Sequence, residues 1–160
     1  MNADYQTLLE MWRTETWARA TKVFRGHGSG VSSVAISKDD KLIASAFRDQ
    51  TVRLWNVSSG ECIRTFQTET ASPYGCGFSN DGTMLVAPFG ANSARVWKTE
   101  TGEVLQTLKA ETGEVLCCCF SSHDELIFTG SGDGTVKVWK TSSGELVRSL
   151  EGHSGLVWAC

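Results

Sequence analysis

A repeat of 42 residues constrains this 160-residue chain more than any other feature of its sequence. Three tryptophans, Trp55, Trp97 and Trp139, stand 42 residues apart. The same interval separates Gly60, Gly102 and Gly144, and also Phe66, Leu108 and Leu150. Self-similarity at a period of about 20–50 residues is typical of repeat architectures, so the chain is predicted to be an array of similar units.

Each unit has the pattern of four short strands separated by turns. In the first unit, β-branched and apolar residues occupy 31–37, 42–47, 51–55 and 62–66, with polar or glycine-containing turns between them. Strands that are apolar on both faces must be covered on both faces, so each small sheet needs neighbours stacked against it. A unit of about 40–45 residues with a tryptophan-bearing strand near its end is typical of a β-propeller blade.

The repeat resembles that of the WD-repeat family. The similarity lies in the Gly26-His27 pair, its copy at Gly152-His153, the turn at 79–82 and the segment 132–139. It covers residues 25–150, and the aspartate that follows tryptophan in the family is replaced by Asn56, Lys98 and Lys140. The resemblance implies an all-β fold: a WD-repeat β-propeller segment of three four-stranded antiparallel blades, with partial blades at both ends.

The period places the blades at 25–66, 67–108 and 109–150, the second being degenerate, and a further first strand at 151–160. Residues 1–24 are predicted to form the last two strands of another blade. An N-terminal helix is the alternative, because Tyr5, Leu8, Leu9 and Trp12 would share one helical face. Propellers have about 4–8 blades, so we expect a part of a longer propeller, or a chain completed by another copy or partner.

In the family, a buried polar network joins the histidine of Gly-His to a second-strand serine or threonine, a turn aspartate and the tryptophan. The resemblance implies such structural roles for His27, Ser45, Asp49, Trp55, Trp97, Thr129, Asp133, Trp139 and His153. The second blade has alanines in place of the serine and the aspartate, and it carries both prolines, which interrupt strand pairing. It is predicted to be the weakest blade.

Family members commonly bind partners through the residue after the first-strand valine and the residue before the turn aspartate, at one face of the propeller. Carried over by position, the predicted partner-binding residues are Ser32, Arg48, Tyr74, Leu116 and Trp158. Aromatic and arginine side chains are frequent in interface hot spots. The alternative is that Tyr74 and Trp158 only pack against neighbouring blades.

Candidate catalytic and metal sites are better explained by the repeat. His27 and His153 occupy the Gly-His position, and the three histidines lack zinc-ligand spacing. Residues 130–135 lack the Lys-Ser/Thr of a phosphate loop and precede a strand. Cys76, Cys118 and Cys160 share one first-strand position, typical of small core side chains, and the six cysteines are expected to be reduced thiols. We therefore expect no enzyme activity, no cofactor and no metal.

The predicted function is a non-catalytic protein–protein interaction scaffold within a larger complex. The alternatives are a peptide-reading or substrate-receptor module, and the regulatory part of a longer protein that carries an enzyme domain. A net charge of −3 offers no basic field for nucleic acid. No signal peptide or apolar span of about 18 residues is present. We expect protein or peptide partners, possible self-association that completes the propeller, no membrane association and a cytoplasmic or nuclear location.

Overall fold

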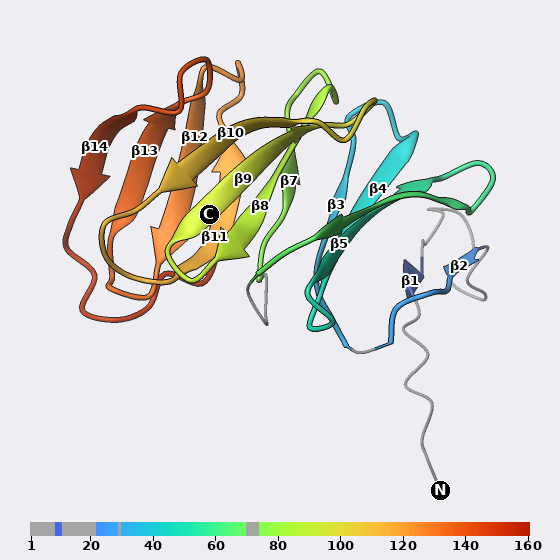
Figure 1. Cartoon of the computed structure of the whole chain (residues 1–160), viewed down its shortest axis with the longest axis horizontal. Helices are drawn as coiled ribbons and strands as arrows, with labels where there is room; N and C mark the ends of the chain where they lie inside the picture. The colour runs from blue at the N-terminus through green and yellow to red at the C-terminus, as the bar shows by residue number, and fades with distance from the viewer. Residues whose placement is uncertain (1–8, 11–21, 29, 70–73) are drawn as a thin grey trace, which may run out of the picture.

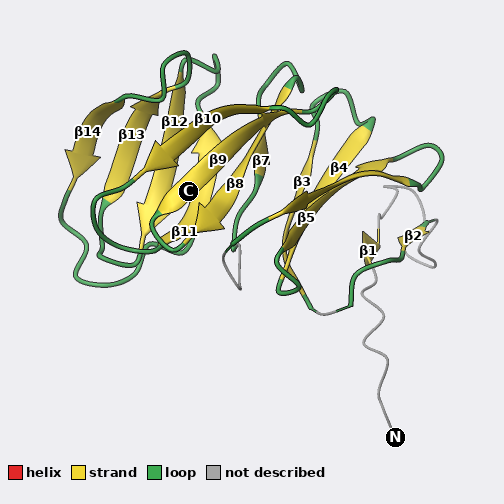
Figure 2. Cartoon of the chain, in the orientation of Figure 1, coloured by secondary structure: helices red, strands yellow, loops and turns green. Residues whose placement is uncertain are grey.

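The computed structural model describes residues 9–10, 22–28, 30–69 and 74–160. Three four-stranded antiparallel sheets stand one beside the next, and a two-stranded ribbon lies beside the first (Figure 1). The sheets do not close into a ring (Figure 1). Figure 2 shows strands and loops only; the described residues contain no helix, and so none that could cross a membrane. The predicted fold class is confirmed.

In every sheet, each strand pairs with the next one along the chain. The first sheet contains β3 (Val31–Ile36), β4 (Leu42–Phe47), β5 (Thr51–Asn56) and β6 (Cys62–Gln67). The second contains β7 (Gly77–Phe78), β8 (Met84–Gly90), β9 (Ser93–Lys98) and β10 (Val104–Lys109). The third contains β11 (Val115–Phe120), β12 (Leu126–Ser131), β13 (Val136–Lys140) and β14 (Leu146–Leu150). The strands of the first sheet lie within one residue of their predicted bounds.

The core consists of the spaces between sheets. The two faces of β8 point to opposite neighbours: Leu85 and Ala87 join residues of the first sheet, whereas Val86 joins residues of the third. All three side chains are fully buried. This arrangement explains why the strands are apolar on both faces, since each face of the middle sheet is covered by another sheet.

The recurring tryptophans join each sheet to the last strand of the sheet before it. The ring centroid of Trp55 lies 5.9 Å from that of Phe24, and the centroid of Trp97 lies 5.1 Å from that of Phe66. Trp139 shares a buried cluster with Leu108. The period in the sequence is therefore a period of inter-sheet contacts.

The ribbon at the start of the chain consists of β1 (Leu9–Glu10) and β2 (Val23–Phe24), which pair antiparallel. These four residues form strands, which agrees with the strand prediction for residues 1–24 and not with the helix alternative. The remainder of the strands or helix predicted for residues 1–24 lies outside the described residues, apart from Lys22, which precedes β2.

The second sheet departs most from the repeat. Its first strand, β7, is only two residues long, whereas β3 and β11 have six residues each. The register of β8 against β9 shifts between Pro88 and Gly90. Pro73 lies outside the described residues. A proline cannot donate a ladder hydrogen bond, which accounts for the irregularity at Pro88.

Residues 151–160 do not form the first strand that the repeat predicts. They lie against the third sheet, where the Val157 amide donates a 3.1 Å hydrogen bond to the Ser131 carbonyl. The Cys160 thiol contacts the Phe128 carbonyl at 3.9 Å, and its repeat equivalent Cys76 contacts the Ala44 carbonyl at 3.8 Å. The segment thus occupies the place of a first strand. Among the described residues, no second strand lies edge to edge with it to complete a sheet.

Candidate interaction surface

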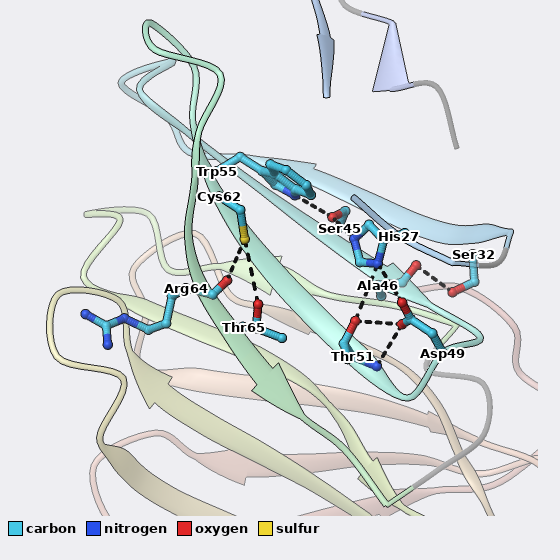
Figure 3. A network of polar contacts seen from close by, with 10 residues as sticks. All are labelled: His27, Ser32, Ser45, Ala46, Asp49, Thr51, Trp55, Cys62, Arg64 and Thr65. Atoms are coloured by element: carbon cyan, nitrogen blue, oxygen red, sulfur yellow. Dashed lines mark hydrogen bonds and ion pairs between the residues drawn. The ribbon is translucent and has the colours of Figure 1, made fainter. Parts of the chain in front are cut away.

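The first sheet holds a buried chain of hydrogen bonds (Figure 3). The Trp55 indole donates to Ser45 Oγ at 2.7 Å, and Ser45 Oγ lies 3.0 Å from His27 Nε2. On the other side of the ring, His27 Nδ1 lies 3.1 Å from Asp49 Oδ2. Thr51 donates its hydroxyl to Asp49 Oδ1 at 2.6 Å. The structure therefore brings together the four residues that the resemblance places in one network.

The partners determine how protons are arranged in this network. Ser45 accepts from Trp55 and so donates its own hydroxyl to His27 Nε2, which leaves the proton on Nδ1 for Asp49. Burial lowers the pKa of His27 to about 4, although the Asp49 carboxylate acts in the opposite direction. The imidazole is therefore neutral at pH 7. It joins strands here, and its acceptor nitrogen is already occupied, so it is not poised as a base.

The third sheet builds its network without a histidine. Trp139 donates to Thr129 Oγ1 at 2.9 Å, as Trp55 does to Ser45. Asp133 accepts from the hydroxyls of Thr135 and Thr112 at 2.6 and 3.0 Å, and these bonds help hold its pKa well below the usual range. Lys137, which is only 6% exposed, places Nζ 3.4 Å from Asp133 Oδ2.

Sequence reasoning missed the roles of Lys137 and Thr112. The available signal was a lysine in a strand, four residues after the turn aspartate Asp133 and at a position where the other two repeats carry Arg53 and Arg95. In this sheet a cation and a hydroxyl satisfy the aspartate that a histidine satisfies in the first sheet.

The remaining two network residues have different surroundings. Trp97 packs among Phe66 and Phe89, with ring centroids at 5.1 and 6.5 Å, and the Arg95 guanidinium stacks on Phe89 at 3.3 Å. Aromatic packing thus takes the place of the polar network in the second sheet. His153 is exposed in the segment after β14, outside both polar networks.

A second repeated contact clasps each sheet to the next. The donors are side chains 42 residues apart, on or beside the last strand of one sheet. The acceptors are carbonyls in the turn between the third and fourth strands of the next sheet. Lys22 donates to Ser58, Arg64 donates to Glu100 at 2.6 Å, and Gln106 donates to Ser142 at 3.2 Å. The glycine of each turn has positive φ, and a β-carbon at Gly102 would lie only 2.8 Å from Arg64 Cδ. The recurring glycines are therefore required by both turn and clasp.

We predict that Arg64→Ala lowers the free energy of unfolding by about 0.5–1.5 kcal/mol, the usual net value of one hydrogen bond. Its repeat equivalent Arg148 lies exposed on β14, and no carbonyl in the described chain accepts from it. Arg148→Ala is the matched control and should change the unfolding free energy by less than about 0.5 kcal/mol. Urea denaturation measures both, and equal losses would contradict the clasp.

The predicted partner-binding residues gather at the end of the sheets where the first strands begin and the second strands end. We call the surface formed there by Arg48, Tyr74 and Trp158 the end face. The rings of Tyr74 and Trp158 meet edge to face with centroids 5.1 Å apart. Trp158 remains 52% exposed, and Arg48 is exposed just after β4. The two aromatic residues thus pack on each other while one still offers a large apolar surface.

Two of the predicted residues do not present free side chains. Leu116 is only 3% exposed, so the expectation that its side chain is accessible to a partner is wrong. The Ser32 hydroxyl donates to the Ala46 carbonyl at 2.9 Å. Both residues lie where the register of the first strand shifts against the second, and such bulges re-aim side chains.

A groove of about 810 Å³ lies elsewhere, between the second and third sheets. Its walls include Met84, Leu105, Leu126 and Val147, near the turns at the end opposite the end face. No group of three or more His, Cys, Asp or Glu side chains among the described residues is arranged to hold a metal ion.

Comparison with known proteins places these features among propeller repeats. The WD40 family, described as WD domain, G-beta repeat, matches residues 18–56 and 102–140. WD repeat-containing protein 18 of Homo sapiens is 48% identical over 46 residues, 29% of this chain and 11% of that protein. The ribosome biogenesis protein BOP1 homolog of Drosophila ananassae is 43% identical over 47 residues, 29% of this chain and 6% of that protein.

Two further similarities cover more of the chain. Periodic tryptophan protein 2 of Arabidopsis thaliana is 40% identical over 65 residues, 41% of this chain and 7% of that protein. The solved structure of U3-55K superposes with a TM-score of 0.81 at 24% identity, over 86% of this chain and 44% of that one. The last similarity shows the fold alone, and the matched segments span about a tenth or less of the curated relatives.

Proposed function

Because this chain belongs to the WD-repeat family, we propose that it is a non-catalytic scaffold for protein–protein assembly within a larger complex. The observation that supports this most is the end face, where half-exposed Trp158 and exposed Arg48 stand on a rigid array of sheets. Aromatic and arginine side chains on a packed scaffold are favoured contact residues for another protein. The polar side chains of the first-sheet network, His27 and Asp49 among them, are engaged in holding strands together.

The outer side of the third sheet supports a second contact. Phe24, Phe66 and Leu108 are 3%, 5% and 1% exposed because a following sheet covers each of them, whereas the equivalent Leu150 is 44% exposed. Arg148 stands beside it as the unused clasp donor. We therefore propose that another tryptophan-bearing sheet covers this side, supplied by further chain, by a partner or by a second copy.

The two finer alternatives have no observation in their favour. The groove lies at the opposite end from the end face, so it does not support peptide reading through the end face. An accompanying enzyme domain has no counterpart among these residues. For the compartment, the name of one relative, a ribosome biogenesis protein, favours the nucleus over the cytoplasm. Fluorescence imaging of the tagged chain tests that choice.

Site-specific photo-crosslinking tests the proposed contacts. A crosslinking amino acid is placed at position 158 for the end face, at position 150 for the outer side, and at position 41 as control. Lys41 is exposed in the turn before β4, at the other end of the sheets. We expect protein adducts from positions 158 and 150 in cell extract, and several-fold fewer from 41.

Adducts at position 150 between two copies of the purified chain would identify self-association as the source of the additional sheet. Equal yields from all three positions, or adducts from 158 that consist of nucleic acid, would overturn the scaffold proposal. Replacing Arg48 and Tyr74 together by alanine should remove the protein adducts at 158 without unfolding the chain. Circular dichroism checks that the fold is retained.

A further inference from the structure

Three cysteine thiols meet at the junction between the third sheet and the segment that follows it. Along β11, the Cys118 side chain points toward the second sheet and is buried there. Cys117 and Cys119, one residue to either side, point to the opposite face because strand side chains alternate. The segment 156–160 lies on that face and brings Cys160 to it.

The contacts place Cys160 beside both of these thiols. Its sulfur lies 3.9 Å from the carbonyl oxygen of Phe128, the residue that pairs with Cys119 across β11 and β12. The Cys160 side chain lowers the pKa of both Cys117 and Cys119. Cys117 in turn contacts the Val157 carbonyl at 3.7 Å. The segment is also attached by the backbone hydrogen bond from Val157 to Ser131 and by the ring of Trp158, which meets that of Tyr74.

The other repeats show that this arrangement is particular to one junction. The positions of Cys117 and Cys119 are held by Ser33 and Ala35 in the first sheet and by Gly75 and Gly77 in the second. Cys76 and Cys118, which are the equivalents of Cys160, therefore face no thiol at those positions. The repeat places Cys76, Cys118 and Cys160 at three successive junctions, and among these only the last has thiols on both sides.

We propose that Cys119 and Cys160 are a peroxide-oxidisable dithiol whose disulfide fastens residues 156–160 to the third sheet. Access favours Cys119 over Cys117, since Cys119 is half-buried and Cys117 is buried, while Cys160 is exposed. The Cys160 thiol lowers the pKa of Cys119 while its own pKa is raised, so Cys119 is the one of the pair that ionises first. Thiolate is the form that hydrogen peroxide oxidises.

The chemistry balances with hydrogen peroxide as the oxidant. The Cys119 thiolate takes one oxygen from the peroxide, whose O–O bond breaks, and becomes a sulfenic acid as hydroxide leaves. The Cys160 thiol then loses its proton, and its sulfur attacks the sulfenic sulfur of Cys119 and displaces a second hydroxide, which forms the S–S bond. Two thiols and one peroxide thus give one disulfide and two waters, and a reducing dithiol reverses the step.

Peptide mapping of the intact chain tests the proposal. The purified chain is treated with hydrogen peroxide, free thiols are blocked with N-ethylmaleimide, and a non-reducing tryptic digest is analysed by mass spectrometry. Trypsin leaves residues 110–137 as one peptide and 149–160 as another, with Cys160 as the only cysteine of the second. We expect these two peptides to be joined, with a loss of about 2 Da relative to the reduced pair.

Variants assign the link within the first peptide. Cys160→Ser should abolish the joined species, Cys119→Ser should slow its formation at least about tenfold, and Cys117→Ser should leave the rate within about twofold. Cys62→Ser is the matched control, because Cys62 is also exposed but lies in the first sheet, away from the cluster. Mapping of the wild-type chain needs no substitution and so does not depend on the stability of the variants.

Three results would overturn the proposal. One is a wild-type chain that gives only sulfinic or sulfonic acid at these positions. Another is a link between two copies through Cys62 or Cys160 in place of the 119–160 link, seen as a dimer on a non-reducing gel. The third is a link carried by Cys117 that persists unchanged in Cys119→Ser.

Discussion

Trp139→Ala is expected to lower the free energy of unfolding by about 3–5 kcal/mol, the usual cost of removing a buried tryptophan side chain. Trp139 is 3% exposed and lies in the cluster that joins the second and third sheets. Its indole also donates to Thr129, so truncation leaves a buried hydroxyl without its donor as well as a cavity. Urea denaturation followed by circular dichroism measures the change.

Two substitutions separate packing from hydrogen bonding at this site. Trp139→Phe keeps an aromatic ring but removes the N–H, and should cost less than the alanine variant does. Trp158→Ala is the matched control, since that indole is 52% exposed and should cost less than about 1 kcal/mol. If Trp139→Ala and Trp158→Ala proved equally costly, the recurring tryptophans would not be the inter-sheet contacts described above.

The second large effect is a loss of stability as the pH falls from about 6.5 to about 4. The folded chain lowers the pKa of His27 to about 4 from 6.5, so in this window the unfolded chain binds a proton that the folded chain does not. His27 stabilises the fold fully above pH 6.5, and this contribution disappears as the pH approaches 4. The expected total is about 3 kcal/mol from the size of the shift.

Urea denaturation at pH 7, 6, 5 and 4.5 measures this dependence. His27→Gln should be less stable at pH 7 but should show a flatter dependence between pH 6.5 and 4.5. His123→Gln is the control, because His123 is exposed in the turn after β11 and should leave the dependence unchanged. A dependence that survives intact in His27→Gln would show that another group is responsible.

The repeat itself could be predicted because its signals are local. Apolar alternation, turn residues and tryptophans at equal spacing each depend on a few neighbouring residues, and together they placed the strands of the first sheet to within one residue. Residues 151–160 followed the same pattern without forming a strand, because strand pairing depends on a partner that local pattern does not reveal.

The candidate site was only partly predictable. Position in the repeat correctly indicated that Tyr74 and Trp158 lie at one end of the array, but not that their rings touch or that Leu116 is buried. A bulge changes the direction of a side chain without any change in spacing. The groups that replace the missing histidine of the third sheet, Lys137 and Thr112, were likewise invisible to the family pattern.

The sequence by itself determined the three four-stranded sheets, the order of their strands and the recurring tryptophans between them, because in a repeat array these follow from period and alternation. Only the tertiary structure decided which polar groups satisfy Asp133, which side chains clasp successive turns, and which thiols meet at the last junction. Those contacts join atoms of different strands or sheets, and they depend on side-chain reach and direction as well as on spacing.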